Sequence, residues 1–137
     1  MKRALILCTG NSARSQMAEG LLRHQAGDRY EVHSAGISPS FVRPEAIQVM
    51  NEMGIDISGH RSKSVDEFRD QSFDVVLTVC DHARESCPLF PGSPQAIHWS
   101  IPDPAAVQGD GEDKIRAFRE ARDMLREWIV GFVGAQA

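Results

Sequence analysis

The chain has 137 residues, and its 15 lysines and arginines against 19 aspartates and glutamates give a formal net charge of −4. This length predicts one domain over residues 1–137, and 42% hydrophobic residues suffice for an ordinary core, which excludes global disorder. The acidic balance argues against a nucleic-acid partner, and no apolar run approaches the roughly 18 residues that cross a bilayer, so we expect no membrane partner either.

Hydrophobic patterning predicts that strands and helices alternate along the chain. Short apolar or alternating runs indicate strands, and apolar residues that recur every three or four positions indicate helices. Gly27 and Gly54 are placed to end the first two helices, and Pro44 is placed to begin the second. In chain order, the pattern predicts a strand at 4–7, a helix at 15–25, a strand at 30–34, a helix at 44–53, strands at 73–79 and 96–99, and a helix at 113–133.

This alternation is typical of βαβ units, in which parallel strands carry helices on both faces. We therefore predict an α/β fold with a mainly parallel four-stranded sheet. Ligands in such folds bind at the carboxyl ends of the strands. Because Cys8, Cys80 and the segment after Trp99 each follow a predicted strand, they could meet at one edge of the sheet.

The start of the chain and its cysteine count bear on location. Met1-Lys2-Arg3 is positively charged, but only residues 4–7 are apolar before Cys8, whereas a secretory signal needs about 7–15 apolar residues. Three cysteines are too few, and odd in number, for a secreted disulfide scaffold. We therefore expect a cytoplasmic protein whose cysteines rest as thiols.

The clearest candidate site is a Cys-x5-Arg motif between the first strand and the first helix. Backbone amides of such a loop and of the following helix start attract an anion, and the Arg14 guanidinium can grip two oxygens of a tetrahedral oxyanion. The positive electrostatic potential of these amides and of Arg14 also favours the thiolate of Cys8, to which Ser15 could donate a hydrogen bond. A core cysteine followed by a surface arginine would explain neither the Gly-Asn turn nor the position. The residues expected to bind the oxyanion are Thr9, Gly10, Asn11, Ser12, Ala13, Arg14 and Ser15.

The segment CTGNSARSQMAEG, residues 8–20, resembles the signature of arsenate reductases built on the low-molecular-weight protein tyrosine phosphatase fold. The resemblance covers essentially the whole chain, through SAG at 34–36, IDIS at 55–58, TVC at 78–80, CP at 87–88, HW at 98–99, DPA at 103–105 and FR at 118–119. It implies that Cys8 attacks arsenate while Arg14 and the loop amides hold the oxyanion. It also implies that Asp103, which lies between two prolines, acts as general acid; otherwise Asp103 would be a solvated turn residue.

The two later cysteines are typical of the reductase branch. Reduction of arsenate to arsenite takes two electrons, which two thiols supply by forming a disulfide. The resemblance implies that Cys80 attacks the Cys8–arsenic adduct, that arsenite leaves, and that Cys87 then attacks Cys80 to give a Cys80–Cys87 disulfide. It further implies recycling by thioredoxin, with glutaredoxin and glutathione as the alternative.

The spacing of Cys80 and Cys87 limits how these two cysteines can form a disulfide. Residues 81–85 contain neither glycine nor proline and could form a helical turn or two before Pro88. Seven residues of helix span about 10.5 Å, whereas a disulfide tolerates Cα separations up to roughly 7 Å. We therefore expect this segment to unwind when the Cys80–Cys87 disulfide forms.

Some reductases of this group bind potassium beside the loop through an Asn, a Glu, a Ser and an Asp, and Asn11, Glu19 and Ser34 match the first three. The aspartate position falls on Lys63, whose ammonium could replace the cation and pair with Glu19. The alternative is a solvated surface lysine. We expect potassium not to be required. A second departure is Ala13, at a position that is often cysteine in this superfamily.

We predict no metal and no tightly bound cofactor. Cys80, His82 and Cys87 could be mistaken for zinc ligands, but Cys-x6-Cys is not a usual zinc spacing. The remaining histidines show no partner pattern, and we expect surface or capping roles for His24, His33, His60 and His98.

Two other functions fit part of the pattern. A protein tyrosine phosphatase of this fold usually has aromatic residues just after Asp-Pro, where this chain has Ala105-Ala106, although slow hydrolysis of small aryl phosphates could remain. A non-catalytic sensor could bind arsenite through its thiols, but it would not need Arg14 or Asp103. We therefore expect an arsenate-reducing monomer, with phosphate or sulfate as competing anions.

Overall fold

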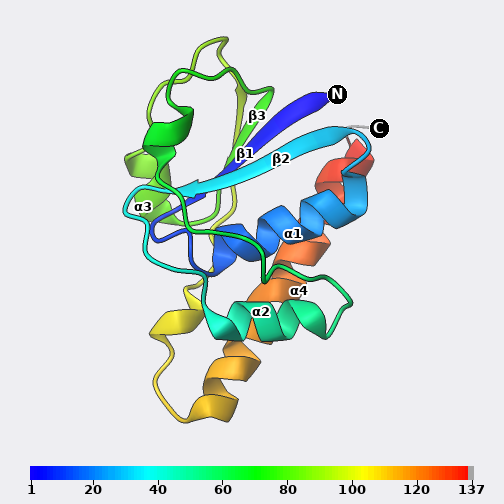
Figure 1. Ribbon diagram of the computed structural model, residues 1–137, viewed down its shortest axis with the longest axis vertical. Coiled ribbons are helices and arrows are strands. Elements are labelled where there is room, and N and C mark those ends of the chain that lie inside the picture. The colour runs from blue at the N-terminus through cyan, green and yellow to red at the C-terminus, as the bar shows by residue number, and fades with distance from the viewer. Residues whose placement is uncertain (136–137) are drawn as a thin grey trace.

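A four-stranded parallel sheet forms the centre of the computed structural model, which describes residues 1–135 (Figure 1). The strands follow the spatial order β2-β1-β3-β4, and all three neighbouring pairs are parallel. Residues 4–8 of the central strand are buried, because both faces of the sheet are covered, and this explains their uninterrupted apolar sequence. The strands are β1 (Lys2–Cys8), β2 (Tyr30–Gly36), β3 (Val75–Thr78) and β4 (Gln95–His98).

The helices connect these strands in the predicted order. The long helices α1 and α4 pack against each other, α2 contacts both, and α1 lies against β1 and β2 (Figure 1). The short helix α3 contacts β1 and β3. The helices are α1 (Arg14–Ala26), α2 (Pro44–Asn51), α3 (Asp81–Glu85) and α4 (Gly111–Ala135), with 3-10 turns η1 (Val65–Phe68) and η2 (Pro104–Ala106).

Aromatic contacts show that the two faces of the sheet are covered by different elements. The ring of Tyr30 on β2 lies 5.8 Å from that of Phe132 on α4, whereas the ring of His33 lies 5.3 Å from that of Phe68 on η1. Residues 30 and 33 are an odd number of positions apart, so their side chains point to opposite faces. The fold is therefore the predicted α/β arrangement with helices on both faces of a parallel sheet.

The predicted elements are all present, but several boundaries differ. β3 pairs with β1 and β4 only over residues 75–78, so it is shorter than the apolar run 73–79 that predicted it. α2 ends at Asn51 rather than Met53, and Gly54 takes a positive φ of 76° in the turn that follows. The single-domain prediction included residues 136 and 137, which lie outside the described residues. Within residues 1–135, no helix is both long and apolar enough to span a membrane.

The strand register aligns the carboxyl ends of the sheet. Cys8 pairs with Gly36, Leu7 with Thr78, and Thr78 with His98, so the segments after β1, β3 and β4 leave from one edge. Gly36 is required here, because a Cβ at this position would lie 2.7 Å from the carbonyl oxygen of Thr9. The predicted convergence of these segments is confirmed.

Candidate active site

The loop of residues 8–15 joins β1 to α1 and surrounds the thiol of Cys8. Cys8 is buried, and its Sγ lies 2.9 Å from Oγ of Ser15. Asn11 takes a left-handed conformation with φ 46°, and its Nδ2 donates to Oγ of Ser15 at 2.8 Å and to Oγ of Ser34 at 3.0 Å. Because Asn11 donates to Ser15, the hydroxyl hydrogen of Ser15 remains available to the sulfur of Cys8.

The beginning of α1 faces this loop with unsatisfied donors. Ala13 precedes the helix, and among the described residues no side chain caps its first turn. The first N–H groups of a helix have no partner within the helix, so they are suited to hold an anion. The predicted oxyanion site thus has a helix start and a loop that converge beside Cys8.

Arg14 links the loop to the segment that follows β4. Its side chain is 13% exposed, and its Nη1 donates to the carbonyl oxygen of Ile101 at 3.0 Å. Its Nη2 lies 3.9 Å from Oδ2 of Asp103. Asp103 precedes and caps η2, because its Oδ1 accepts a hydrogen bond from the amide of Ala105 at 3.0 Å; one oxygen is thus fixed, and the carboxylate stays half-exposed. The structure therefore brings Asp103 to the same edge as Cys8.

Cys80 follows β3 and lies against the loop. Its side chain is buried, and its Sγ lies 3.3 Å from the hydroxyl oxygen of Thr9. The amide of Ala83 donates to the same sulfur at 3.4 Å, so Cys80 caps α3. Arg14, Cys80, Asp81, Ser100, Ile101 and Pro102 line a cavity of about 250 Å³.

Cys87 occupies a different position at the far end of α3. It is half-buried, and burial raises the pKa of its thiol. It lines another cavity, of about 680 Å³, together with Arg84, Leu89 and Phe90. All three cysteines are free thiols. The structure therefore brings Cys80, but not Cys87, to the cavity that Arg14 lines. Residues 81–85, between the two cysteines, form the predicted helix.

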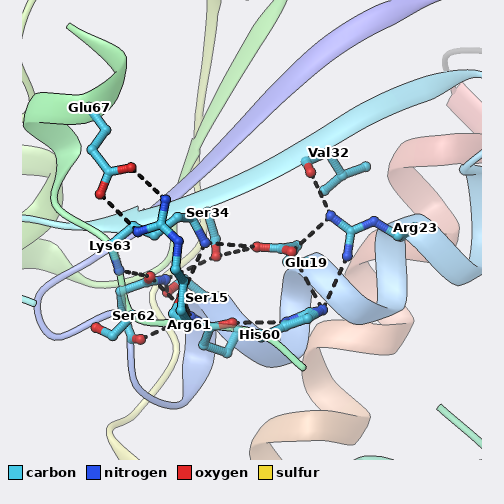
Figure 2. Close-up of polar contacts among 12 residues, drawn as sticks. Ser15, Glu19, Arg23, Val32, Ser34, His60, Arg61, Ser62, Lys63 and Glu67 are labelled. Carbon is cyan, nitrogen blue, oxygen red and sulfur yellow. Dashed lines mark hydrogen bonds and ion pairs between the residues drawn. The ribbon is translucent and has the colours of Figure 1, made fainter. Parts of the chain in front are cut away.

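Next to the 8–15 loop, polar side chains surround the buried carboxylate of Glu19 (Figure 2). We call this group the Glu19 cluster, and it consists of Glu19, Arg23, Ser34, His60 and Lys63. Ser34 donates a short hydrogen bond to Oε1 of Glu19, and Nη2 of Arg23 lies 2.8 Å from Oε2. Burial alone would raise the pKa of Glu19, but the hydrogen bond from Ser34 and the charges of His60, Lys63 and Arg23 outweigh it and lower that pKa. Glu19 is therefore held as a buried carboxylate.

Lys63 belongs to this cluster, so of the two alternatives for this residue the solvated surface lysine is wrong. Its Nζ lies 3.8 Å from Oε1 of Glu19, and its side chain is only 11% exposed. Its backbone is fixed on both sides, because its amide donates to Oδ1 of Asn11 and its carbonyl accepts from the amide of Gly36, each at 2.8 Å. Burial lowers the pKa of Lys63, although Glu19 opposes that shift.

Sequence reasoning missed two polar residues that connect the loop to this cluster. Gln16 is fully buried, and its Nε2 donates to the carbonyl oxygen and to Oδ1 of Asn11 at 3.1 and 3.0 Å. Nδ1 of His60 lies 2.9 Å from Oε1 of Gln16, and burial lowers the pKa of His60. A usable signal was present, because Gln16, Glu19 and Arg23 are polar residues three or four positions apart, which places them on one side of the helix.

The expected surface or capping role is correct for His24, which is exposed, but wrong for His60 and His98. Nδ1 of His98 lies 2.7 Å from Oγ1 of Thr78, and its Nε2 lies 2.8 Å from Oδ1 of Asp81. His33 forms a partly exposed pair with Glu31 at 2.9 Å. Within residues 1–135, no three His, Cys, Asp or Glu side chains form a group that could hold a metal ion.

Comparisons with known proteins agree with this geometry. Residues 3–136 match the family described as low molecular weight phosphotyrosine protein phosphatase. An arsenate reductase of Halalkalibacterium halodurans is 44% identical over 126 residues, which cover 92% of this chain and 91% of the relative. Solved arsenate reductases in the oxidized state and in the phosphate binding state are each 30% identical, cover 100% of both chains, and have TM-scores of 0.85 and 0.81. The chain belongs to the low molecular weight phosphotyrosine protein phosphatase family, in which these arsenate reductases are its relatives.

Proposed function

We propose that this protein reduces arsenate to arsenite through a relay of three cysteines. The observation that carries the proposal is the position of Cys80, whose sulfur lies 3.3 Å from Thr9 of the loop that begins at Cys8. A phosphatase needs one thiol and a water at this edge, whereas a reductase needs a second thiol. The arsenate reductases among the relatives support the same activity.

In the first step, the loop amides and Arg14 hold arsenate, and the Cys8 thiolate forms a bond to arsenic. The hydroxyl that leaves takes a proton from Asp103 and departs as water, as expected of a general acid beside the anion. The hydrogen bond between Ser15 and Cys8, at 2.9 Å, stabilises the thiolate before attack. Arsenic is still pentavalent after this step.

In the second step, the Cys80 thiolate attacks the sulfur of Cys8. The sulfur–arsenic bond breaks with its electron pair on arsenic, so arsenic becomes trivalent and leaves as arsenite, and a Cys8–Cys80 disulfide remains. In the third step, Cys87 attacks Cys80 and releases the Cys8 thiolate. The oxidising equivalents then reside in a Cys80–Cys87 disulfide at the two ends of α3.

We extend this proposal to recycling by thioredoxin. Cys87 lies beside Leu89, which is an apolar side chain 98% exposed, and both line the 680 Å³ cavity. An exposed apolar residue beside the outer cysteine suits a protein reductant that must approach the disulfide. Such a relay of free thiols fits the reducing cytoplasm, and we propose that the protein acts there as a monomer.

We also propose that Lys63 replaces a potassium ion. Its ammonium lies in the Glu19 cluster and is shielded from solvent, which supports the substitution. The unfolding temperature of the wild-type protein should be the same in potassium and sodium chloride at equal ionic strength. Lys63→Ala should be less stable and should recover part of the loss in potassium only. A potassium-specific gain in the wild type would contradict this proposal.

The experiment that tests the main proposal is arsenate-dependent NADPH oxidation with thioredoxin and thioredoxin reductase. Cys8→Ser, Cys80→Ser and Cys87→Ser should each abolish turnover, and hydrolysis of a small aryl phosphate should be lost only in Cys8→Ser. Hydrolysis without reduction in the wild type would instead make the protein a phosphatase. Arsenite binding without either activity would make it a sensor. Turnover with glutaredoxin and glutathione alone would identify a different reductant.

A further inference from the structure

A polar cluster lies at the start of α3, next to Cys80. We call it the Asp81 cluster, and it consists of Thr78, Asp81, His98 and Ser100. Oγ of Ser100 donates to Oδ1 of Asp81 at 2.7 Å, and Nε2 of His98 lies 2.8 Å from the same oxygen. Nε2 of His98 also lies 3.2 Å from Oγ of Ser100. The cluster therefore joins the first residue of α3 to the end of β4 and to the segment after it.

The hydrogen bonds of this cluster have a defined direction. The hydrogen bonds from Ser100 and from His98 lower the pKa of Asp81, so its carboxylate is charged and can only accept. Nε2 of His98 must then carry the donated hydrogen, and Nδ1 of the same ring lies 2.7 Å from Oγ1 of Thr78. The side chain of His98 is 17% exposed. The imidazole is thus anchored on β3 and presents one donor to Asp81.

Besides this cluster, the start of α3 is held by the sulfur of Cys80, which accepts from the amide of Ala83, and by packing against β1 and β3. The helix spans only residues 81–85, and Ala83 is its one buried residue. Helices this short are unstable without tertiary contacts. Cys80 directly precedes Asp81, and its sulfur must lie against the 8–15 loop to reach Cys8. Asp81 and Ser100 also line the 250 Å³ cavity together with Arg14 and Cys80, so part of the cluster shares a cavity with two residues of the proposed reaction.

We propose that His98 and Ser100 are positioning residues, which hold Asp81 and thereby keep the thiol of Cys80 against the 8–15 loop for its attack on Cys8. This inference rests on the proposed arsenate reduction and concerns its second step. Without the cluster, the start of α3 detaches, and the sulfur of Cys80 spends less time in contact with Thr9. The first step, which uses Cys8, Arg14 and Asp103, does not depend on the cluster.

If Asp81 acted only through its charge, its removal would speed the attack of Cys80 on Cys8 instead of slowing it. The direction of the change in rate therefore tests the inference. A carboxylate beside Cys80 repels its thiolate, so removing the charge of Asp81 should speed the attack if Asp81 has no positioning role. Removing a hydrogen-bonded anchor should instead slow it. The two effects are separated by Asp81→Ala, which removes charge and anchor, and Asp81→Asn, which removes the charge but retains an oxygen that can accept from Ser100 and His98.

The experiment follows a single turnover of reduced protein in a Cys87→Ser background, where each molecule releases one arsenite and stops at the Cys8–Cys80 disulfide. We expect arsenite release to be about tenfold slower in Asp81→Ala, as for the loss of a hydrogen bond to a charged group. Ser100→Ala should be slowed by a smaller factor, and Asp81→Asn should recover most of the rate. The matched control is Glu31→Ala, which removes a carboxylate paired with His33 at 2.9 Å on β2 and should leave the rate unchanged.

A second measurement does not require turnover. Iodoacetamide labelling of each cysteine, followed by peptide mass spectrometry, should be several-fold faster at Cys80 in Asp81→Ala than in Asp81→Asn, which lacks the same charge, with labelling of Cys8 and the unfolding temperature unchanged. Release of arsenite at or above the control rate in Asp81→Ala, or equal labelling of Cys80 in Asp81→Ala and Asp81→Asn, would overturn the inference. Absence of arsenite from the Cys87→Ser parent would instead refute the proposed function, and the labelling result would then decide the positioning role by itself.

Discussion

Asn11 is the residue that links nucleophile, loop and buried cluster. Its left-handed backbone turns the loop, and its side-chain nitrogen donates to both Ser15 and Ser34. Its Oδ1 accepts from the backbone of Lys63 and from Gln16. Asparagine tolerates this backbone conformation better than most residues and carries two donors and an acceptor. One side chain therefore fixes the orientation of the Ser15 hydroxyl toward Cys8.

Ser15→Ala should slow the first step about tenfold, because it removes a hydrogen bond to a charged sulfur, which is worth roughly 1.5 kcal/mol or more. The measurement is the rate of arsenate-dependent turnover together with the rate of Cys8 alkylation by iodoacetamide at pH 7. Ser58→Ala, on the exposed segment after α2, is the control. Equal alkylation rates for Ser15→Ala and the wild type would show that Ser15 does not activate Cys8.

The Glu19 cluster predicts a dependence of stability on pH. The pKa of Glu19 is lowered in the folded protein, so the unfolded chain binds more protons in acid. The contribution of the Glu19 charge is therefore complete above the unfolded pKa, near 4.5, and is lost as the pH falls through the lower folded pKa.

Glu19→Gln should consequently be less stable than the wild type by about 2–4 kcal/mol at pH 7, because it leaves the Lys63 ammonium, whose side chain is 11% exposed, without its carboxylate. This difference should shrink as the pH falls from about 5 to 3. Urea unfolding at several pH values measures it, and Glu45→Gln on α2 is the control. A difference that stays constant over this range would mean that Glu19 is not charged in the folded protein.

At the scale of elements, hydrophobic patterning predicted the four strands and the helices α1, α2 and α4, whereas α3 was expected only because residues 81–85 lack glycine and proline. Residues 4–8 are apolar since both faces of β1 are covered, and Gly27 and Gly54 follow the ends of α1 and α2. The shorter extent of β3 was not predictable, because it depends on where β1 and β4 supply partners rather than on the apolar run itself. Pairing between strands is a property of the sheet and not of one segment.

The element that must change during the relay is α3. The amide of Arg84 donates to the carbonyl of Cys80 at 3.2 Å, and that of Ser86 donates to the carbonyl of His82 at 3.0 Å. Cys80 and Cys87 flank α3, and a continuous helix over these seven positions would separate their Cα atoms by about 10.5 Å, whereas a disulfide tolerates up to roughly 7 Å. Both hydrogen bonds should therefore be lost in the oxidised protein.

Hydrogen exchange of these amides tests this prediction. Arg84 and Ser86 should be protected in the reduced protein and exchange at nearly unprotected rates once Cys80 and Cys87 are joined. Amides of β1 serve as the internal control, because the central strand should stay protected in both states. Equal protection of Arg84 and Ser86 in both redox states would mean that the disulfide forms without unwinding α3.

At the scale of the whole molecule, the parallel register explains what the sequence predicted, and the packing of the connections explains what it missed. Alignment of the strand ends brings Cys8, Cys80 and Asp103 to one edge, and a βαβ pattern is sufficient to expect this. The pair formed by Gln16 and His60 joins residues 44 positions apart, on a helix and a connecting segment without periodicity. Such contacts depend on how the connections pack, so neither His60 nor His98 could be placed from spacing alone.

The surface around Cys87 predicts how a protein reductant engages the oxidised molecule. Leu89 is 98% exposed, so Leu89→Asp should not alter stability, but it places a charge where we propose that thioredoxin docks. The KM for thioredoxin should rise about tenfold at saturating arsenate, while the KM for arsenate and the reduction of the disulfide by dithiothreitol stay unchanged. Val130→Asp, at a half-exposed apolar position on α4, is the control. An unchanged KM for thioredoxin in Leu89→Asp would place the docking surface elsewhere. Slower reduction of the disulfide by dithiothreitol in the same variant would mean that the substitution changes the disulfide itself.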